Sequence, residues 1–137
     1  MYFLDCPNGF TYYPHTHKCY QFFDESPTWQ EARKKCISEG GDLASVPDQK
    51  TNDFLLSISP KGSLIGGYMK TDSLDSWTWT DGTTWTFTNW LPGEPWNKDE
   101  KWLWLTGLNE PKKDRQGKWN NGYSSWTSGT YGFICQI

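Results

Sequence analysis

Several features that would place this chain in a common class are missing from its 137 residues. It contains no run of 18 apolar residues, so we expect no membrane insertion by this segment. Met1 to Leu4 are too few for the apolar part of a signal peptide, so any export signal is expected outside this segment. Thirteen basic and sixteen acidic side chains give a net charge of -3. That balance lacks the cationic field of nucleic-acid-binding proteins, so nucleic acid is not an expected partner.

Histidine is scarce, which bears on catalysis. Only His15 and His17 are present, in a proline-containing turn, and no third zinc ligand lies near them in the sequence. We interpret them as a surface pair. A Ser-His-Asp or Cys-His arrangement would have to use one of them. The carboxylates that could act on a glycosidic bond all sit in turn-like contexts, and none is marked as a buried acid of raised pKa. The sequence therefore predicts a protein that is not an enzyme.

The four cysteines are Cys6, Cys19, Cys36 and Cys135, and none of them forms a C-x-x-C pair. Two disulfides are favoured over buried free thiols, although spacing leaves three connectivities open. In the chain-entropy model, a bridge closing 14 residues contributes about 3 kcal/mol and one closing 100 residues about 4.7 kcal/mol. Disulfides form in oxidising compartments, so they predict an extracellular location, either secreted or on the ectodomain of a surface protein.

Aromatic residues are abundant instead: they make up 18% of the chain and include ten tryptophans. The mean hydropathy is nevertheless -0.80, so the apolar content lies in a few large rings. Such rings suit both a small core and a recognition surface. A chain of this length buries enough surface for one core, which predicts a single domain over residues 1–137.

Two helices are predicted in the first half. Thr28 and Glu31 fit a capping box, and Gly40 and Gly41 end the pattern, which predicts a helix over residues 28–39. A second helix is predicted over residues 48–59, from Asp48 to the turn before Pro60. The N-terminal stretch "CPNGFTYYPHTHKCYQFF" predicts a hairpin.

From Leu64 onward the chain has the texture of short strands and long loops. The runs that predict strands are "LIGGY", "SWTWT", "TWTFTNW", "KWLWLTG", "GKWNN" and "YGFICQI". Helices followed by strands indicate an α+β domain. The charged segment "TGLNEPKKDRQGKW" is expected to be a solvated hairpin tip.

A cluster of oxygen-bearing side chains raises the question of a metal. Glu94, Asn97, Asp99 and Glu100 lie within seven residues, and the Asn120-Asn121 pair follows a probable strand. Calcium binds carboxylate and amide oxygens of this kind. Their spacing alone is equally typical of an ordinary polar loop.

The order of "CPNGF", "KCYQF", "WQEARKKC", "GGDLASV", "LIGGY", "WTWTDGT", "FTNWLPGEP", "GKWNN" and "GFICQI" resembles that of a C-type lectin-like domain of the long form. The resemblance runs from Cys6 to Gln136. It implies two helices flanking small antiparallel sheets, with a long loop region that binds ligands. It also implies the pairings Cys6 with Cys19 and Cys36 with Cys135.

The chain departs from the family pattern at an inner disulfide. Trp102 stands where the first cysteine of that disulfide is expected, and the second falls among Ser124, Ser125 and Trp126. Two large rings can brace loops by burying apolar area. We therefore expect Trp102 to pack against Trp126.

The calcium and sugar motif is altered as well. Glu94 and Pro95 match the family's Glu-Pro-Asn triplet, but Trp96 replaces its asparagine. Glu100 and Asn120 match, and Asn121 replaces an aspartate. Two carboxylates therefore remain of three, which predicts weakened Ca²⁺ binding by Glu94, Asn97, Glu100, Asn120 and Asn121. Indole offers no oxygen, so either Asn97 or Asp99 would have to make up for Trp96.

Trp96 suggests a further role, because the apolar face of a sugar stacks on aromatic rings. By strand alternation Trp90, Trp102 and Trp104 are expected to face the core, which leaves Trp96 exposed. The sequence thus predicts non-catalytic extracellular recognition of a glycan or cell-surface glycoprotein, with Glu94, Trp96, Asn97, Glu100, Asn120 and Asn121 as ligand-binding residues. The alternative is calcium-independent recognition of a protein or another surface.

Overall fold

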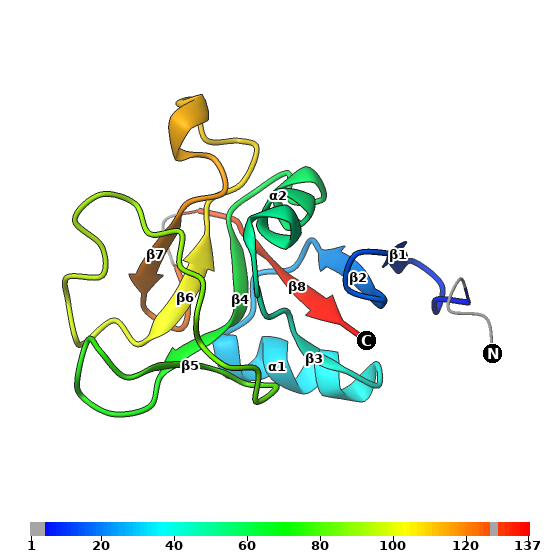
Figure 1. Ribbon diagram of the computed structural model, residues 1–137, viewed down its shortest axis with the longest axis horizontal. Helices are drawn as coiled ribbons and strands as arrows, with labels where there is room; N and C mark the ends of the chain where they lie inside the picture. Colours follow the sequence, from blue (N-terminus) through cyan, green and yellow to red (C-terminus); the bar gives the residue numbers. More distant parts are fainter. Residues whose placement is uncertain (1–4, 127–128) are drawn as a thin grey trace.

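The computed structural model describes residues 5–126 and 129–137 (Figure 1). In chain order the elements are β1 (Thr11–Tyr13), β2 (Lys18–Phe23), α1 (Trp29–Ser38), β3 (Asp42–Leu43), α2 (Gln49–Ser57), β4 (Ser63–Met69), β5 (Trp77–Trp79), β6 (Trp102–Leu105), the 3-10 helix η1 (Lys113–Arg115), β7 (Trp119–Gly122) and β8 (Gly132–Gln136). The α+β class and the two predicted helices are confirmed.

The strands form one connected sheet. Its order is β1-β2-β8-β4-β6-β7, with β3 paired to β8 and β5 paired to β4. The pairing of β4 with β8 is parallel, and the other pairings are antiparallel. The expectation of small antiparallel sheets is thus refined to a single mixed sheet. The N-terminal hairpin, β1 and β2, forms one edge of this sheet, and β7 forms the other.

The sheet carries a core on each face. Figure 1 shows α1 and α2 on opposite sides of the central strands. Successive side chains of a strand point to opposite faces, and β6 shows this clearly. Leu103 and Leu105 join the core that includes Leu55 of α2, whereas Trp104 joins the core that includes Trp29 of α1. Both cores therefore depend on the register of the same strands.

The helix boundaries follow from local capping. The Thr28 hydroxyl accepts from the Glu31 backbone N–H at 3.2 Å, and the Glu31 carboxylate accepts from the Thr28 N–H at 2.9 Å. This reciprocal pair satisfies two donors that a helix N-terminus otherwise leaves free. Asp48 caps α2 by accepting from the Thr51 N–H at 2.9 Å.

Both predicted disulfides are present. Cys6 is bonded to Cys19, which fastens the N-terminal segment to β2. Cys36 is bonded to Cys135, which fastens α1 to β8. The pairings implied by the family resemblance are confirmed.

Residues 84–90 do not form the predicted strand. The segment makes one isolated bridge, between Trp90 and Trp119. Its alternation is nevertheless kept, since Thr84, Thr86 and Thr88 are exposed while the rings between them are half-buried. Those rings pack on the side chain of Trp119, so the segment covers the core as extended chain. The alternation of polar and aromatic residues predicts which side of the segment faces the core. It does not predict that another strand pairs with the segment.

Two smaller expectations concern turns and surfaces. The segment between β6 and β7 has exposed residues at 111–115 and projects from the body of the domain, as a solvated hairpin tip should (Figure 1). His15 contacts the carboxylate of Asp48 at 2.8 Å.

Among the described residues, no helix has the length and apolar character needed to cross a membrane.

Candidate functional site

The residues predicted to bind a ligand lie on a loop that leads into β6 and on the edge strand β7. The loop is attached to β7 by the Leu91 N–H, which donates to the Trp119 carbonyl at 2.8 Å. It then makes two tight turns. The Glu94 N–H donates to the Leu91 carbonyl at 2.9 Å, and the Glu100 N–H donates to the Asn97 carbonyl at 3.1 Å. These contacts bring Glu94 and Glu100 back beside β7.

Asn121 joins the loop to β7 from inside. Its side chain is 2% exposed. The amide Nδ2 donates to the Asn97 carbonyl at 2.6 Å and to the Glu100 carbonyl at 2.9 Å. The other end of the same group, Oδ1, is enclosed and has no hydrogen-bond partner among the described residues. A buried acceptor without a donor costs free energy, so this oxygen has an unused capacity to accept a hydrogen bond.

Two carboxylates lie close to Asn121. Burial raises the pKa of Glu94 above its ordinary value, the Asn121 backbone amide lowers it, and the negative charge of Glu100 raises it again. The two carboxylates are thus near enough to repel each other. Asn120 follows Trp119 on β7 and is half-buried. Glu94 and Glu100 therefore lie beside Asn121, and Asn120 lines the same hollow as Glu100 and Asn121.

The other predicted residues are arranged differently. The Asn97 side-chain oxygen accepts from the Asp99 N–H at 3.0 Å, and its amide reaches Glu100 Oε1 at 3.5 Å. Trp96 is 65% exposed, as expected. It lines a depression of about 540 Å³ together with Leu74 and Asp99, on the side of the loop that Asn97 shares. Asp99 thus lies with Trp96.

These donors can be compared with what a divalent cation needs. The cluster offers two carboxylates, the amide of Asn120 and the unpaired Oδ1 of Asn121. Calcium accepts such oxygens, and each missing charge lowers its affinity. Within the described ranges there is no group of three His, Cys, Asp or Glu side chains that could hold a metal. The donor types are ones that calcium accepts, and only two of them carry a charge.

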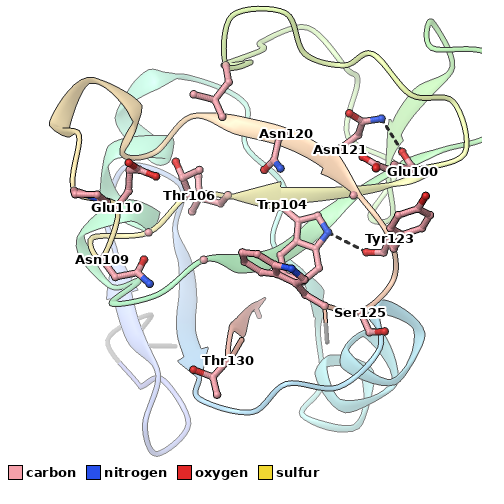
Figure 2. Close-up of a pocket in the computed structure, with 17 residues that line it drawn as sticks. Glu100, Trp104, Thr106, Asn109, Glu110, Asn120, Asn121, Tyr123, Ser125 and Thr130 are labelled. Atoms are coloured by element: carbon pink, nitrogen blue, oxygen red, sulfur yellow. Dashed lines mark hydrogen bonds between the residues drawn. The ribbon is translucent and has the colours of Figure 1, made fainter. Parts of the chain in front are cut away.

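A larger hollow, of about 570 Å³, opens next to this cluster on β6 and β7 (Figure 2). Glu100, Asn120 and Asn121 form part of its lining. The remaining lining includes Trp104 and Trp126. Sequence reasoning did not select these two as site residues. Because Trp104 pairs with Asn120 across the strands, the W-x-W pattern of "KWLWL" placed beside "KWNN" was the signal that could have found Trp104.

The predicted brace between Trp102 and Trp126 is wrong. Trp126 lies edge to face with Trp104, at 6.4 Å between ring centroids and an interplanar angle of 77°. Trp102 instead packs against Trp29 of α1, at 6.4 Å. Residues 102 and 104 share a face of β6, and the ring at 104 reaches the segment around residue 126.

The tryptophans expected in the core differ in burial. Trp104 is 7% exposed and belongs to the core on the α1 face, whereas Trp90 and Trp102 are half-buried. Trp104 also forms the floor of the hollow, so it serves both core and surface.

Comparisons with known proteins bear on the family and the fold. The family model described as Lectin C-type domain matches residues 25–137. The C-type lectin lectoxin-Lio3 of Erythrolamprus poecilogyrus is 33% identical, over 96% of this chain and 81% of its own length. Curated relatives differ in size, and the chain spans between 32% and 88% of their lengths.

Solved structures show the same fold. The cow C-type carbohydrate-recognition domain of CD23, determined in the presence of GlcNAc2Man3 oligosaccharide, superposes with a TM-score of 0.79 at 29% identity, over 96% of this chain and 95% of that one. A calcium-independent type II antifreeze protein superposes with a TM-score of 0.81 over 96% and 93% of the two chains, and at 24% identity this likeness concerns the fold alone. The chain belongs to the C-type lectin domain family.

Proposed function

We propose that this domain is a non-catalytic extracellular recognition module that binds glycans at Glu94, Glu100, Asn120 and Asn121. A weakly held calcium ion assists the binding. The observation that carries the proposal is the enclosed, unpaired Oδ1 of Asn121 beside two mutually repelling carboxylates. Folding gains nothing from such an arrangement, whereas a cation or a hydroxyl group would satisfy it.

Each residue has a definite part in this proposal. Glu94, Glu100, Asn120 and Asn121 would hold calcium, which when bound supplies a charged centre for sugar hydroxyls. Asn97 shapes the loop through its bonds to Asp99 and Glu100. Trp96 presents an exposed ring in the separate depression that it shares with Asp99, where the apolar face of a further sugar of the same glycan can stack. The likeness to a carbohydrate-recognition domain whose structure was determined in the presence of an oligosaccharide supports this proposal.

Thermal or chemical unfolding with calcium and with EDTA tests the cation. For a dissociation constant of about 1 mM, 10 mM calcium should stabilise the protein by about 1.4 kcal/mol. Asn121→Asp supplies a third carboxylate but loses the two hydrogen bonds that the amide donates to the Asn97 and Glu100 carbonyls, so the variant should be less stable than the parent in EDTA. Its stabilisation by calcium should nevertheless saturate at lower calcium. Glu94→Gln should remove the response. Asp99→Asn is the matched control, because this carboxylate lines the other depression, and its response should equal that of the parent.

The same Glu94→Gln variant has an expected effect without calcium. The folded-state pKa of Glu94 is raised, so ionised Glu94 destabilises the fold at neutral pH. The variant should therefore be slightly more stable than the parent in EDTA. No calcium response in either the parent or Asn121→Asp would reject the calcium part of the proposal.

A glycan array tests the ligand class. The parent should bind neutral glycans, Asn120→Ala should lose that binding, and Trp96→Ala should weaken it. If no glycan is bound under any calcium condition, glycan recognition is wrong.

One observation favours a second candidate, calcium-independent recognition of a protein surface. The amide of Asn121 already ties the loop through two carbonyls, so the loop does not depend on an ion for its shape. Binding of a glycoprotein that persists in EDTA and after removal of its glycans would favour this candidate.

A further inference from the structure

We propose that the 570 Å³ hollow on β6 and β7 is a second sugar subsite, which takes a neutral pyranose ring of the glycan held at Glu94 and Asn121. The inference rests on the proposed function and extends it to glycan length and charge. The hollow has the size of small-molecule sites in proteins, about 300–1,000 Å³.

Trp104 lies at the floor of the hollow and is only 7% exposed, so it supports the more exposed rings beside it. Trp104 and Asn120 are directly paired across β6 and β7, so their side chains share one face. The indole Nε1–H of Trp104 donates to the Tyr123 carbonyl at 3.0 Å, as Figure 2 shows. A Cβ on Gly122 would lie 2.5 Å from this indole nitrogen. Glycine at residue 122 therefore allows the ring to lie flat against β7.

Exposed rings stand beside this floor. Trp126 is 58% exposed and Tyr123 is 57% exposed, although each is large and apolar. Trp126 meets Trp104 edge to face. Exposed aromatic rings that border a polar hollow are typical of recognition surfaces, since the C–H face of a sugar covers a ring while its hydroxyls stay hydrogen-bonded.

The rim supplies groups suited to hydroxyls. Asn109 and Asn120 lie on the hollow, as Figure 2 shows, and neither side-chain amide is hydrogen-bonded to another residue in the described part of the chain. An amide both donates and accepts, which matches a hydroxyl. Two such amides at separate points of the rim can fix the orientation of a ring.

The charge of the side chains that line the hollow limits the class of sugar that it can bind. The lining contains the carboxylates of Glu100 and Glu110, and no Lys, Arg or His side chain lies among the described residues that form it. Calcium would neutralise only the shared edge at Glu100, so a sulfated or sialylated ring in the hollow would bring an anion against Glu110 without a counter-charge, which is unfavourable. A neutral ring meets no such penalty.

The hollow is continuous with the proposed cation site, which consists of Glu94, Glu100, Asn120 and Asn121. Glu100, Asn120 and Asn121 belong to both. A glycan whose terminal residue is held at this shared edge can extend its next residue over Trp104 towards Asn109. We therefore expect the second subsite to act on oligosaccharides and not on single sugars.

Isothermal titration with paired probes tests the inference. The probes are the methyl glycosides of mannose, galactose and N-acetylglucosamine, set beside mannotriose, lactose and chitotriose. For the sugar that binds, the oligosaccharide should bind about tenfold more tightly than the methyl glycoside. Trp126→Ala should abolish this gain and leave the methyl glycoside affinity unchanged, and Trp126→Phe should keep part of it. Ile37→Ala, which removes an equally exposed apolar side chain from α1, is the control and should change neither affinity.

The possible outcomes separate the two proposals. If no probe binds the parent, the proposed glycan function fails. If the methyl glycoside and the oligosaccharide bind equally and Trp126→Ala changes neither, only the second subsite is wrong. Equal weakening of both probes by Trp126→Ala would make the hollow the primary site and overturn the inference. Tighter binding of sialylated or sulfated oligosaccharides than of neutral ones would overturn it as well.

Discussion

The two halves of the domain are held together by different means. The covalent half consists of the N-terminal hairpin, α1 and β8. Cys6–Cys19 fastens the N-terminal segment to β2 of the hairpin, and Cys36–Cys135 fastens α1 to β8. Residues 71–126 contain no cysteine. They are joined by the tryptophan cluster, which consists of Trp77, Trp79, Trp85, Trp90 and Trp119.

The tryptophan cluster shows how residues 71–126 can keep their shape without a disulfide. Trp119 is fully buried at the centre of the cluster, and its Nε1–H donates to the Asn52 side-chain oxygen at 2.7 Å. Trp79, Trp85 and Trp90 surround it with centroids 5.6 to 5.8 Å away. Rings from separated segments therefore converge on β7, and the edge of β7 remains available for Asn120 and Asn121.

The largest expected effect concerns the covalent half. Replacing both Cys36 and Cys135 by alanine opens a cross-link between residues 99 positions apart, which should lower the free energy of unfolding by about 4.7 kcal/mol in the chain-entropy model. Removing Cys6 and Cys19, only 13 positions apart, should cost about 3 kcal/mol. Urea denaturation of the two double variants measures both. Equal losses would show that loop length does not govern the covalent half.

The tryptophan cluster should be nearly as important in its own half. Trp119→Ala removes a fully buried ring and leaves the Asn52 oxygen without its indole donor, so the expected loss is about 4 kcal/mol. Ile37→Ala, at an exposed position, should change stability by less than about 0.5 kcal/mol. A loss below about 1 kcal/mol for Trp119→Ala would mean that something other than the cluster holds the loops.

A smaller effect tests the position of the absent inner disulfide. Trp102 is half-buried against Trp29, so Trp102→Ala should cost about 1 to 2 kcal/mol. Trp126 is mostly exposed, and Trp126→Ala should leave the unfolding midpoint in urea almost unchanged. Equal losses of unfolding free energy in the two variants would favour direct packing of Trp102 against Trp126 after all.

The same contrast explains what the sequence could predict. The capping box at Thr28 and the cap at Asp48 are local signals, because the bonds that they predict join residues three apart. The disulfide pairing followed from the family resemblance, since spacing left three connectivities open. Local chemistry and motif order together were enough for the covalent half.

The loop region was less predictable because its contacts depend on register between distant strands. The W-x-W pattern of "KWLWL" places Trp104 beside Asn120 only when the register of β6 against β7 is known, and no local pattern shows that Trp126 rather than Trp102 meets Trp104. The alternation at Thr84 to Thr88 predicted sidedness correctly but also suggested a strand that has no partner. The cluster of Glu94, Glu100, Asn120 and Asn121 was anticipated, whereas the hollow beside it was not.

The smallest expected effect is a dependence of stability on pH. The N-terminal hairpin is also held to α2 by the contact of His15 with the Asp48 carboxylate. Burial acts to raise the pKa of Asp48, but hydrogen bonds from His15 and Thr51 outweigh it and lower the pKa from 3.8 to about 2. A lowered folded-state pKa contributes stability above pH 3.8, and that contribution is lost as pH falls from 3.8 to about 2. The Asp48 side chain is 44% exposed, so the contribution should stay below about 1 kcal/mol.

Urea denaturation from pH 5 to pH 2.5 measures this contribution. Asp48→Asn is the matched variant, because asparagine caps a helix as well as aspartate and does not titrate. The parent should be the more stable protein at pH 5, and its advantage should shrink as the pH approaches 2.5, since all other carboxylates titrate in both. If the two stability curves stay parallel over this range, the hydrogen bonds of His15 and Thr51 to the Asp48 carboxylate contribute nothing through its ionisation. The hairpin would then depend on the pairing of β2 with β8, on its disulfide and on the stacking of Tyr13 on Phe54 at 4.2 Å.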